Sequence, residues 1–149
     1  MDTYKALKSK TVTVAGGGGF SETVTYQVPP AAKTQVGGGS GPVPSPLATS
    51  VNTQALVTSL YVCNTSAPTV GAAKLTVQVS NYDASSPVVT TLYSDLYVYG
   101  DTTFAVTLNL TLKESDELRV TIDQLGSDIP VIDITIFGIE MVTGVGPHA

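Results

Sequence analysis

The sequence predicts an all-β fold in which two antiparallel sheets pack as a jelly-roll-like β-sandwich. Between Thr53 and Glu140, short runs rich in β-branched residues recur about every ten residues and are separated by turn residues. No stretch shows a helical period longer than one or two turns. Such spacing is typical of a jelly roll or an immunoglobulin-like sandwich. A chain with no Trp and one Cys lacks the immunoglobulin hallmark of a Trp beside paired cysteines, which favours the jelly roll.

Two short strands are expected before residue 30. Residues 9–14 alternate polar with apolar side chains, as a strand with one solvated face does. A run of four glycines follows, which we interpret as a flexible turn. Residues 22–28 place three apolar side chains on one face and stop at a Pro-Pro pair, which cannot extend a β-ladder.

The connection from Pro30 to about Asn52 is rich in Pro, Gly, Ser and Ala. This composition predicts disorder in the free protein. A structureless loop of this length is rare in a compact domain unless the loop is functional. We expect the segment either to extend along a neighbouring subunit or to be a simple insertion at the edge of the sandwich, and the sequence leaves both open.

The strand that organises the body spans residues 54–63 and is apolar on both faces. Leu56 and Leu60 share one parity, and Val57 and Tyr61 share the other. We interpret such a run as an interior strand, covered on one side by the facing sheet and on the other by a partner or a tail.

Six further runs of strand character complete the body. The run at 103–112 carries five apolar residues on one parity, so it is expected to be a long core strand. The last run is expected to bury three isoleucines and to point Asp133 and Thr135 outward. The runs span residues 73–80, 88–93, 95–99, 103–112, 118–123 and 131–140. They suggest three parts: an N-terminal arm with two short strands and the Gly/Pro-rich linker (residues 1–52), a β-sandwich body (53–142) and a flexible C-terminal tail (143–149).

Composition indicates a soluble but unusually apolar chain. Only 13% of the residues are charged and the mean hydropathy is +0.23, yet no apolar run is long enough to cross a membrane. A surface of this kind usually contacts other protein. The first residues have no apolar core of the type found in signal peptides, so we expect no signal peptide here.

The charge is divided unevenly along the chain. The formal net charge of −5 combines a basic first half with an acidic second half. An acidic half argues against nucleic-acid binding, which requires a clustered basic patch. The division would suit copies that bind one another, although ordinary solvated surface charge is the favoured explanation.

Candidates for catalysis are few. His148, the only histidine, lies in a Gly-Pro tail where nothing would position it against a nucleophile. The glycine run at 16–19 is followed by Phe20 rather than by the Lys of a P-loop. A single Cys63 excludes an intrachain disulfide and a Cys-rich zinc site, and its strand context indicates a small buried side chain rather than a reactive thiol.

The sequence also gives little support for metal binding or sugar binding. Asp116 and Glu117 are adjacent acids at an expected hairpin, but no calcium-loop motif surrounds them, so we interpret them as solvated. Tyr82 alone lies in an expected loop. Four other tyrosines lie in strand patterns, where an inward ring with its hydroxyl at the rim is expected: Tyr61, Tyr93, Tyr97 and Tyr99. We therefore predict no catalytic residue, no metal, no cofactor and no enzymatic activity.

Three stretches together resemble small β-sandwich structural proteins of tailed bacteriophages. They are YQVP at residues 26–29, LVTSLYVCNTS at 56–66, and LYSDL at 92–96 leading into DTTFAVTLNLTL at 101–112. In those relatives a strand ending in a Val-Cys-Asn-like triplet is followed by an Asn/Asp-Thr-Phe-Ala-Leu-Thr-Leu segment and a Gly-Asp turn. This chain differs in having Ser115-Asp116 in place of Gly-Asp and a longer Gly/Pro-rich connection.

The resemblance implies a virion component, made in the host cytoplasm and present on the capsid surface. The role that it suggests is that of a capsid decoration or cement protein, whose partners are the major capsid protein or other virion proteins. Such proteins are commonly trimers, so a homo-oligomer is expected, with neither nucleic acid nor membrane as a partner. The alternatives are an accessory neck, tail or baseplate protein and a glycan-binding adhesion module.

Overall fold

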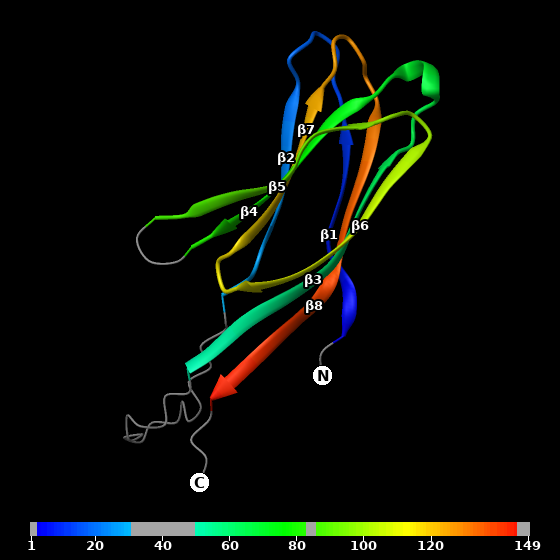
Figure 1. The fold of residues 1–149 in the computed structure, drawn as a ribbon. Helices are drawn as coiled ribbons and strands as arrows, with labels where there is room; N and C mark the ends of the chain where they lie inside the picture. Colours follow the sequence, from blue (N-terminus) through cyan, green and yellow to red (C-terminus); the bar gives the residue numbers. More distant parts are fainter. Residues whose placement is uncertain (1–2, 31–49, 83–85, 146–149) are drawn as a thin grey trace, which may run out of the picture.

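The computed structural model describes residues 3–30, 50–82 and 86–145 (Figure 1). This part of the chain forms eight β-strands and one turn of 3-10 helix. The elements are β1 (Tyr4–Thr13), β2 (Ser21–Gln27), β3 (Ser50–Asn64), η2 (Pro68–Val70), β4 (Ala73–Asn81), β5 (Val88–Val98), β6 (Thr102–Lys113), β7 (Glu117–Gln124) and β8 (Val131–Val145).

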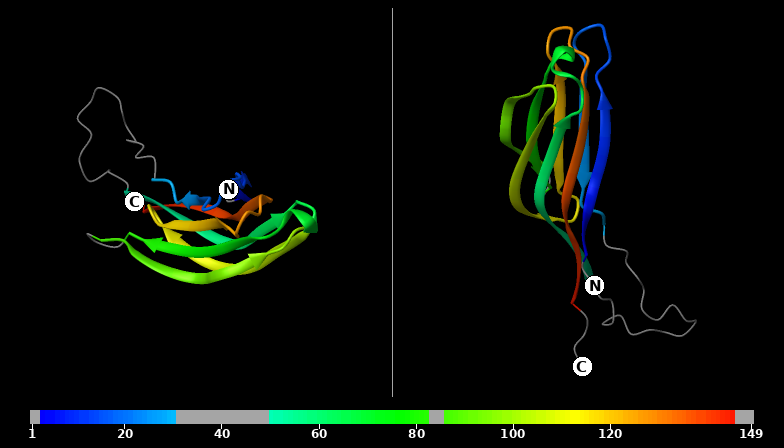
Figure 2. Two further views of the ribbon diagram at one scale, coloured as in Figure 1. Left: turned by 90° about the horizontal axis from the view of Figure 1, so that it is seen from above. Right: turned by 90° about the vertical axis from the view of Figure 1, so that its right-hand side faces the viewer.

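The strands form two antiparallel four-stranded sheets that pack face to face (Figure 2). The first sheet has the order β1-β8-β3-β6 and the second has the order β2-β7-β4-β5. The chain therefore pairs its first strand with its last, its second with its seventh, its third with its sixth and its fourth with its fifth. A long antiparallel ribbon rolled into a sandwich gives this pattern, so the predicted all-β, jelly-roll-like fold is confirmed.

The two strands expected before residue 30 are edge strands of the two sheets. β1 pairs with β8 in the first sheet, and β2 pairs with β7 in the second. The Gly/Pro-rich connection at 31–49 and the last four residues lie outside the described residues. The division of the chain at residues 52 and 142 stays a prediction.

β3 is apolar on both parities because it contains a β-bulge. Its register shifts between Val57 and Ser59 against both of its neighbours. The shift exchanges inward and outward positions, so Ala55 and Val57 are buried before it and Leu60 and Val62 after it. The two apolar parities are thus largely one inward face interrupted by a bulge, and Tyr61 lies on the outer face.

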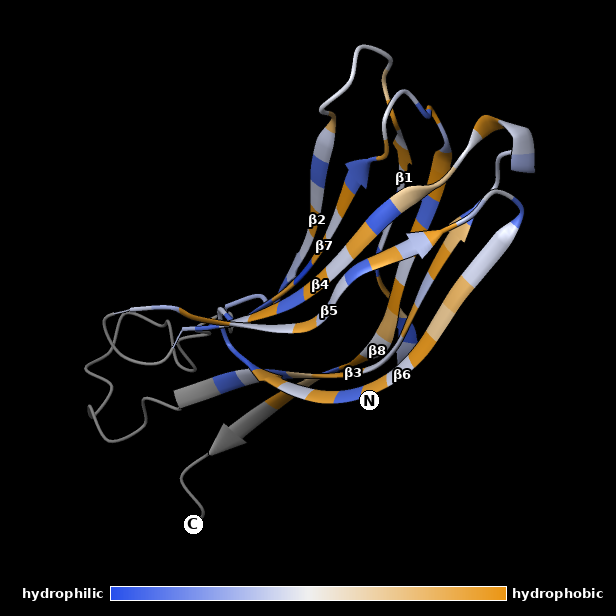
Figure 3. Ribbon diagram, turned by 45° about the horizontal axis from the view of Figure 1, so that its top comes forward, coloured by the Kyte–Doolittle hydropathy of each residue, from blue (hydrophilic) through white to orange (hydrophobic). Residues whose placement is uncertain are grey.

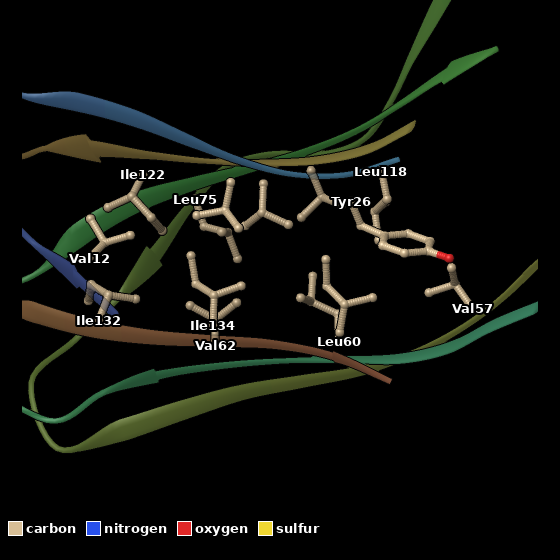
Figure 4. Close-up of a cluster of buried hydrophobic side chains, with 14 of the residues drawn as sticks. Val12, Tyr26, Val57, Leu60, Val62, Leu75, Leu118, Ile122, Ile132 and Ile134 are labelled. Carbon is tan, nitrogen blue, oxygen red and sulfur yellow. The ribbon is translucent and has the colours of Figure 1, made fainter. Parts of the chain in front are cut away.

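The core lies between the sheets and is made by alternating side chains of both layers. Figure 4 shows Leu60, Val62 and Ile134 of the first sheet pointing toward Leu75 and Ile122 of the second. The predicted burial of Ile132, Ile134 and Ile136 in β8 is confirmed, because each is fully buried, whereas the residues between them are only partly covered.

β5 and β6 differ from expectation, and both are edge strands. The separate strands predicted at 88–93 and 95–99 are one strand, β5, with register shifts against β4 and a positive φ of 54° at Asp95. β6 was expected to be a core strand, but only Leu112 of its inward side chains is fully buried. The other apolar side chains of that parity are half-buried: Phe104, Val106, Leu108 and Leu110.

Candidate functional site

The residues singled out for catalysis do not come together in the described part of the chain. His148 lies outside the described residues. The glycine run joins β1 to β2, and three of its members have positive φ, which explains why glycine is required in this turn. Cys63, expected to be buried, is half-buried on the outer face of the first sheet, opposite Asp133.

Asp116 is buried rather than solvated as predicted. Its side chain is part of a residue that is only 2% exposed. One carboxylate oxygen accepts a hydrogen bond from the backbone N–H of Tyr82 at 2.9 Å, and the other accepts one from that of Lys113 at 3.0 Å. Asp116 therefore fastens the β6–β7 turn to the end of β4. Neighbouring Glu117 binds Arg119 at 2.7 Å, and among the described residues no three His, Cys, Asp or Glu side chains are grouped to hold a metal ion.

Three of the four strand tyrosines were assigned to the wrong face. Tyr61, Tyr97 and Tyr99 are 44%, 52% and 60% exposed, whereas inward rings were expected. Tyr61 points outward because the β3 bulge reverses its parity. Only Tyr93 is half-buried, with its ring in a T-shaped contact with Phe104 at 5.5 Å between centroids.

The side of the sandwich bounded by β1 and β2 is closed by polar contacts between the sheets. Lys10 of β1 pairs with Glu22 of β2. Toward the other end, the hydroxyl of Tyr26 donates to Glu140 Oε1 at 2.8 Å, and Lys5 binds Oε2 of the same carboxylate at 3.1 Å. Burial and the hydrogen bond to Glu140 raise the pKa of Tyr26 well above its usual value of about 10.

We call the opposite side the β5/β6 flank and define it as residues 88–98 and 102–112. The Tyr93–Phe104 ring contact and a hydrogen bond from Asn64 Nδ2 to the carbonyl oxygen of Val98 at 3.1 Å join the sheets here, but several apolar side chains stay accessible. Its half-buried side chains pack on the core without being enclosed by it, and Val88 and Val89 are exposed. Figure 3 shows apolar positions recurring along β6 at this edge of the first sheet. The stretch from Thr102 to Leu112 contains no charged residue.

The two edges of the first sheet therefore differ in their protection against strand addition. β1 carries Lys5, Lys8 and Lys10 and a register shift next to Leu7. Lysines and bulges of this kind are the usual means by which an edge strand is kept from pairing with another chain. β6 has a register irregularity near Asn109 but no lysine before Lys113. The β5/β6 flank can thus offer both apolar side chains and an edge of backbone hydrogen-bonding groups to a partner.

A second exposed feature is an aromatic patch on the outer face of the first sheet, formed by Tyr4, Tyr61 and Phe137. These rings and Thr135 line an open depression. The ring of Tyr4 stacks on Phe137 with 5.9 Å between centroids and 11° between planes. Tyr61 meets Phe137 edge-on at 5.5 Å and 90°. The side chains come from β1, β3 and β8, which lie side by side in the sheet.

Of the three rings in this patch, the sequence pattern indicates the outward position of one and misplaces the other two. Phe137 shares the parity of Asp133 and Thr135, so its outward position was readable from alternation. The outward position of Tyr61 was missed, because β3 was interpreted as apolar on both faces and the switch of its inward parity between Val57 and Ser59 was not recognised as a bulge. Tyr4 precedes the first predicted strand, whereas β1 begins at this residue.

The described part of the chain contains no helix that is long and apolar enough to span a membrane.

No family model matches the chain, and no curated protein sequence matches it. Its fold is distantly similar to a chain in the structure of infectious bursal disease virus, Gx strain, with a TM-score of 0.40 and 8% sequence identity over 97% of this chain and 41% of the other. A chain in the structure of the Gt strain gives a TM-score of 0.35 and 9% identity over 93% and 42% of the two chains. The protein spans about two fifths of the length of each of these chains.

Proposed function

We propose that this protein is a virion structural protein of the capsid-decoration type, which binds the shell and neighbouring copies through the β5/β6 flank. The observation that carries the proposal is the contrast between the two sides of the sandwich. One side is closed by Lys10–Glu22 and Tyr26–Glu140 contacts, and the other leaves core side chains of β6 half-covered. A structure that exposes part of its core along one edge is suited to being completed by another protein.

Two further points support the proposal at the level of the fold. The jelly roll is an architecture of viral capsid domains, although it also serves lectins and cupins, so this support is an analogy. The sequence resemblance to small β-sandwich proteins of tailed bacteriophages points to the same class. Neither the fold analogy nor the sequence resemblance requires a catalytic residue in this chain.

The mechanism of stabilisation is passive. Contacts made by the flank exist only when the neighbour is in place, so they stabilise the assembled shell by mass action. Burying the half-exposed apolar side chains of β6 removes them from water, and pairing along the β6 edge supplies hydrogen bonds to its free backbone groups. An extension of residues 30–52 along a neighbouring subunit, which is one of the two expectations for this segment, would add contacts with further subunits.

The proposal is tested with purified virus particles. Quantitative gel analysis is expected to show the protein in many copies per particle, and particles lacking it are expected to rupture at a lower temperature. A few copies at a single vertex, with unchanged rupture, would instead indicate a neck, tail or baseplate protein.

The flank itself is tested by a matched pair of variants. Val89→Lys places a charge on the β5/β6 flank, and Ile129→Lys places the same charge on an aliphatic residue of equal exposure in the β7–β8 loop, since the two residues are 47% and 49% exposed. Only Val89→Lys is expected to reduce incorporation into particles, and circular dichroism confirms that both variants are folded. Equal incorporation of the two variants would remove the flank from the interface.

A further inference from the structure

The aromatic patch differs from the β5/β6 flank in its chemistry. Its three rings lie on the outer face of the first sheet, on the edge strand β1 and its neighbours β8 and β3, and Tyr4 and Tyr61 are 55% and 44% exposed. Tyr4 lies on one side of Phe137, and Tyr61 lies on the other at a right angle to it. The depression therefore has aromatic walls in two orientations.

Hydroxyl groups surround these rings. The hydroxyl of Tyr4 lies 3.4 Å from the side-chain oxygens of both Ser59 and Thr58, and Ser9 lies 3.3 Å from Thr135. These distances are long for O–H···O hydrogen bonds, whose usual range ends near 3.0 Å. The hydroxyls can thus turn toward a ligand at little cost in existing bonds.

The face around the patch is nearly free of charge. Between Val131 and Ile139 of β8, the outward positions of the first sheet hold apolar or hydroxyl side chains and one carboxylate, Asp133. Asp133 accepts a hydrogen bond from Thr11 at 2.6 Å, next to the Ser9–Thr135 pair. A phosphate-bearing ligand would meet this carboxylate with no cation beside it, which disfavours nucleotides and anionic lipids.

We propose that the aromatic patch binds a neutral carbohydrate, with a sugar ring stacked on the exposed rings and its hydroxyls bonded to the surrounding side chains. A pyranose presents an apolar C–H face and a rim of hydroxyls, which matches an aromatic centre with a hydroxyl border. A protein partner fits less well, because a specific interface needs an apolar centre much wider than three rings. The Asp133 carboxylate and the Thr135 hydroxyl supply the acceptors and donors that such ligands require.

The inference goes beyond the proposed structural role and does not depend on it. Glycan binding is measured on the isolated full-length protein, whereas the decoration role is measured on particles. One result can therefore fail without affecting the other.

The test is titration of the full-length protein with neutral trisaccharides of glucose and of N-acetylglucosamine, followed by calorimetry and ligand-observed NMR, with a glycan array as the wider screen. Binding of at least one neutral glycan is expected. Tyr61→Ala should weaken that binding about tenfold, since it removes one stacking ring. Tyr97→Ala removes a similarly exposed ring outside the patch and should leave binding unchanged.

Three results would overturn the inference. The first is that no neutral glycan binds. The second is that Tyr97→Ala and Tyr61→Ala weaken binding equally. The third is that the protein self-associates through a contact that Tyr61→Ala abolishes, which would make the patch an interface between copies. Tyr61→Phe keeps the ring, so it should keep most of the affinity, and circular dichroism checks that Tyr61→Ala is folded.

Discussion

The hydroxyl of Tyr26 and the carboxylate of Glu140 join the two sheets of the sandwich through a hydrogen bond of 2.8 Å. Tyr26 belongs to β2 in the second sheet and is almost completely buried, and Glu140 belongs to β8 in the first. Lys5 binds the other oxygen of Glu140, so the carboxylate stays paired on both sides. This polar bridge closes the β1/β2 side, whereas the β5/β6 side is joined by the ring contact of Tyr93 with Phe104 and by a hydrogen bond from Asn64 to the carbonyl of Val98.

Removing the hydroxyl of Tyr26 should reduce stability and change its response to alkaline pH. Tyr26→Phe is expected to cost about 1–2 kcal/mol near neutrality, measured by urea unfolding. In the folded protein the pKa of Tyr26 is raised, so the neutral form is favoured there. Its contribution is fully present below the unfolded pKa of about 10 and is lost as pH rises above it.

The pH dependence separates this effect from a general loss of packing. Between pH 10 and 11 the stability of the native sequence should fall more steeply than that of Tyr26→Phe, by up to about 1.4 kcal/mol per pH unit. Parallel slopes for the native protein and Tyr26→Phe would mean that folding does not raise the pKa of Tyr26.

Asp116 should be needed for stability even though it belongs to a turn. Asp116→Ala leaves the partly buried N–H groups of Tyr82 and Lys113 without this acceptor, and we expect a loss of about 1–3 kcal/mol in the free energy of unfolding. Glu114→Ala removes another acid from the same turn and should change stability by less than about 0.5 kcal/mol. Equal effects of the two variants in urea unfolding would show that the loss comes from the turn in general.

Gly138 should not tolerate a side chain, because β3 passes close to it next to the bulge. A Cβ at this position would lie 2.2 Å from the carbonyl oxygen of Leu56, a backbone atom that cannot move aside alone. Gly138→Ala is therefore expected to destabilise the protein by about 2–3 kcal/mol in thermal or urea unfolding.

The control for Gly138 lies in the β1–β2 turn. A Cβ at Gly16 meets no atom within 4 Å, so Gly16→Ala should be neutral or slightly stabilising. Should Gly138→Ala unfold at the same temperature as the native protein, the close approach of β3 and β8 would not exist in solution.

The β-sandwich could be predicted from the sequence because the pattern that specifies it lies within each strand segment. Alternation in the segments that form β4, β7 and β8 directly reports which side chains face the core, and turn residues mark where each strand ends. The jelly-roll order followed from excluding the immunoglobulin hallmark. These features need no knowledge of distant contacts.

The errors share a different cause. The outward position of Tyr61 depends on a bulge whose register is set by two neighbouring strands, and the burial of Asp116 depends on a backbone N–H thirty-four residues away. The half-covered state of β6 depends on its place at the edge of a sheet. Each is a property of strand neighbours, which alternation within one segment does not contain.

The difference between the lysine-bearing β1 and the uncharged β6 also bears on how far association can spread. A β-sheet grows into a fibre only if every added molecule presents a fresh receptive edge on its far side. Here the far side is β1, where strand addition is discouraged. Polymerisation through the first sheet should therefore terminate after one joining event, which lets such a molecule be produced in quantity without forming filaments before it meets its target.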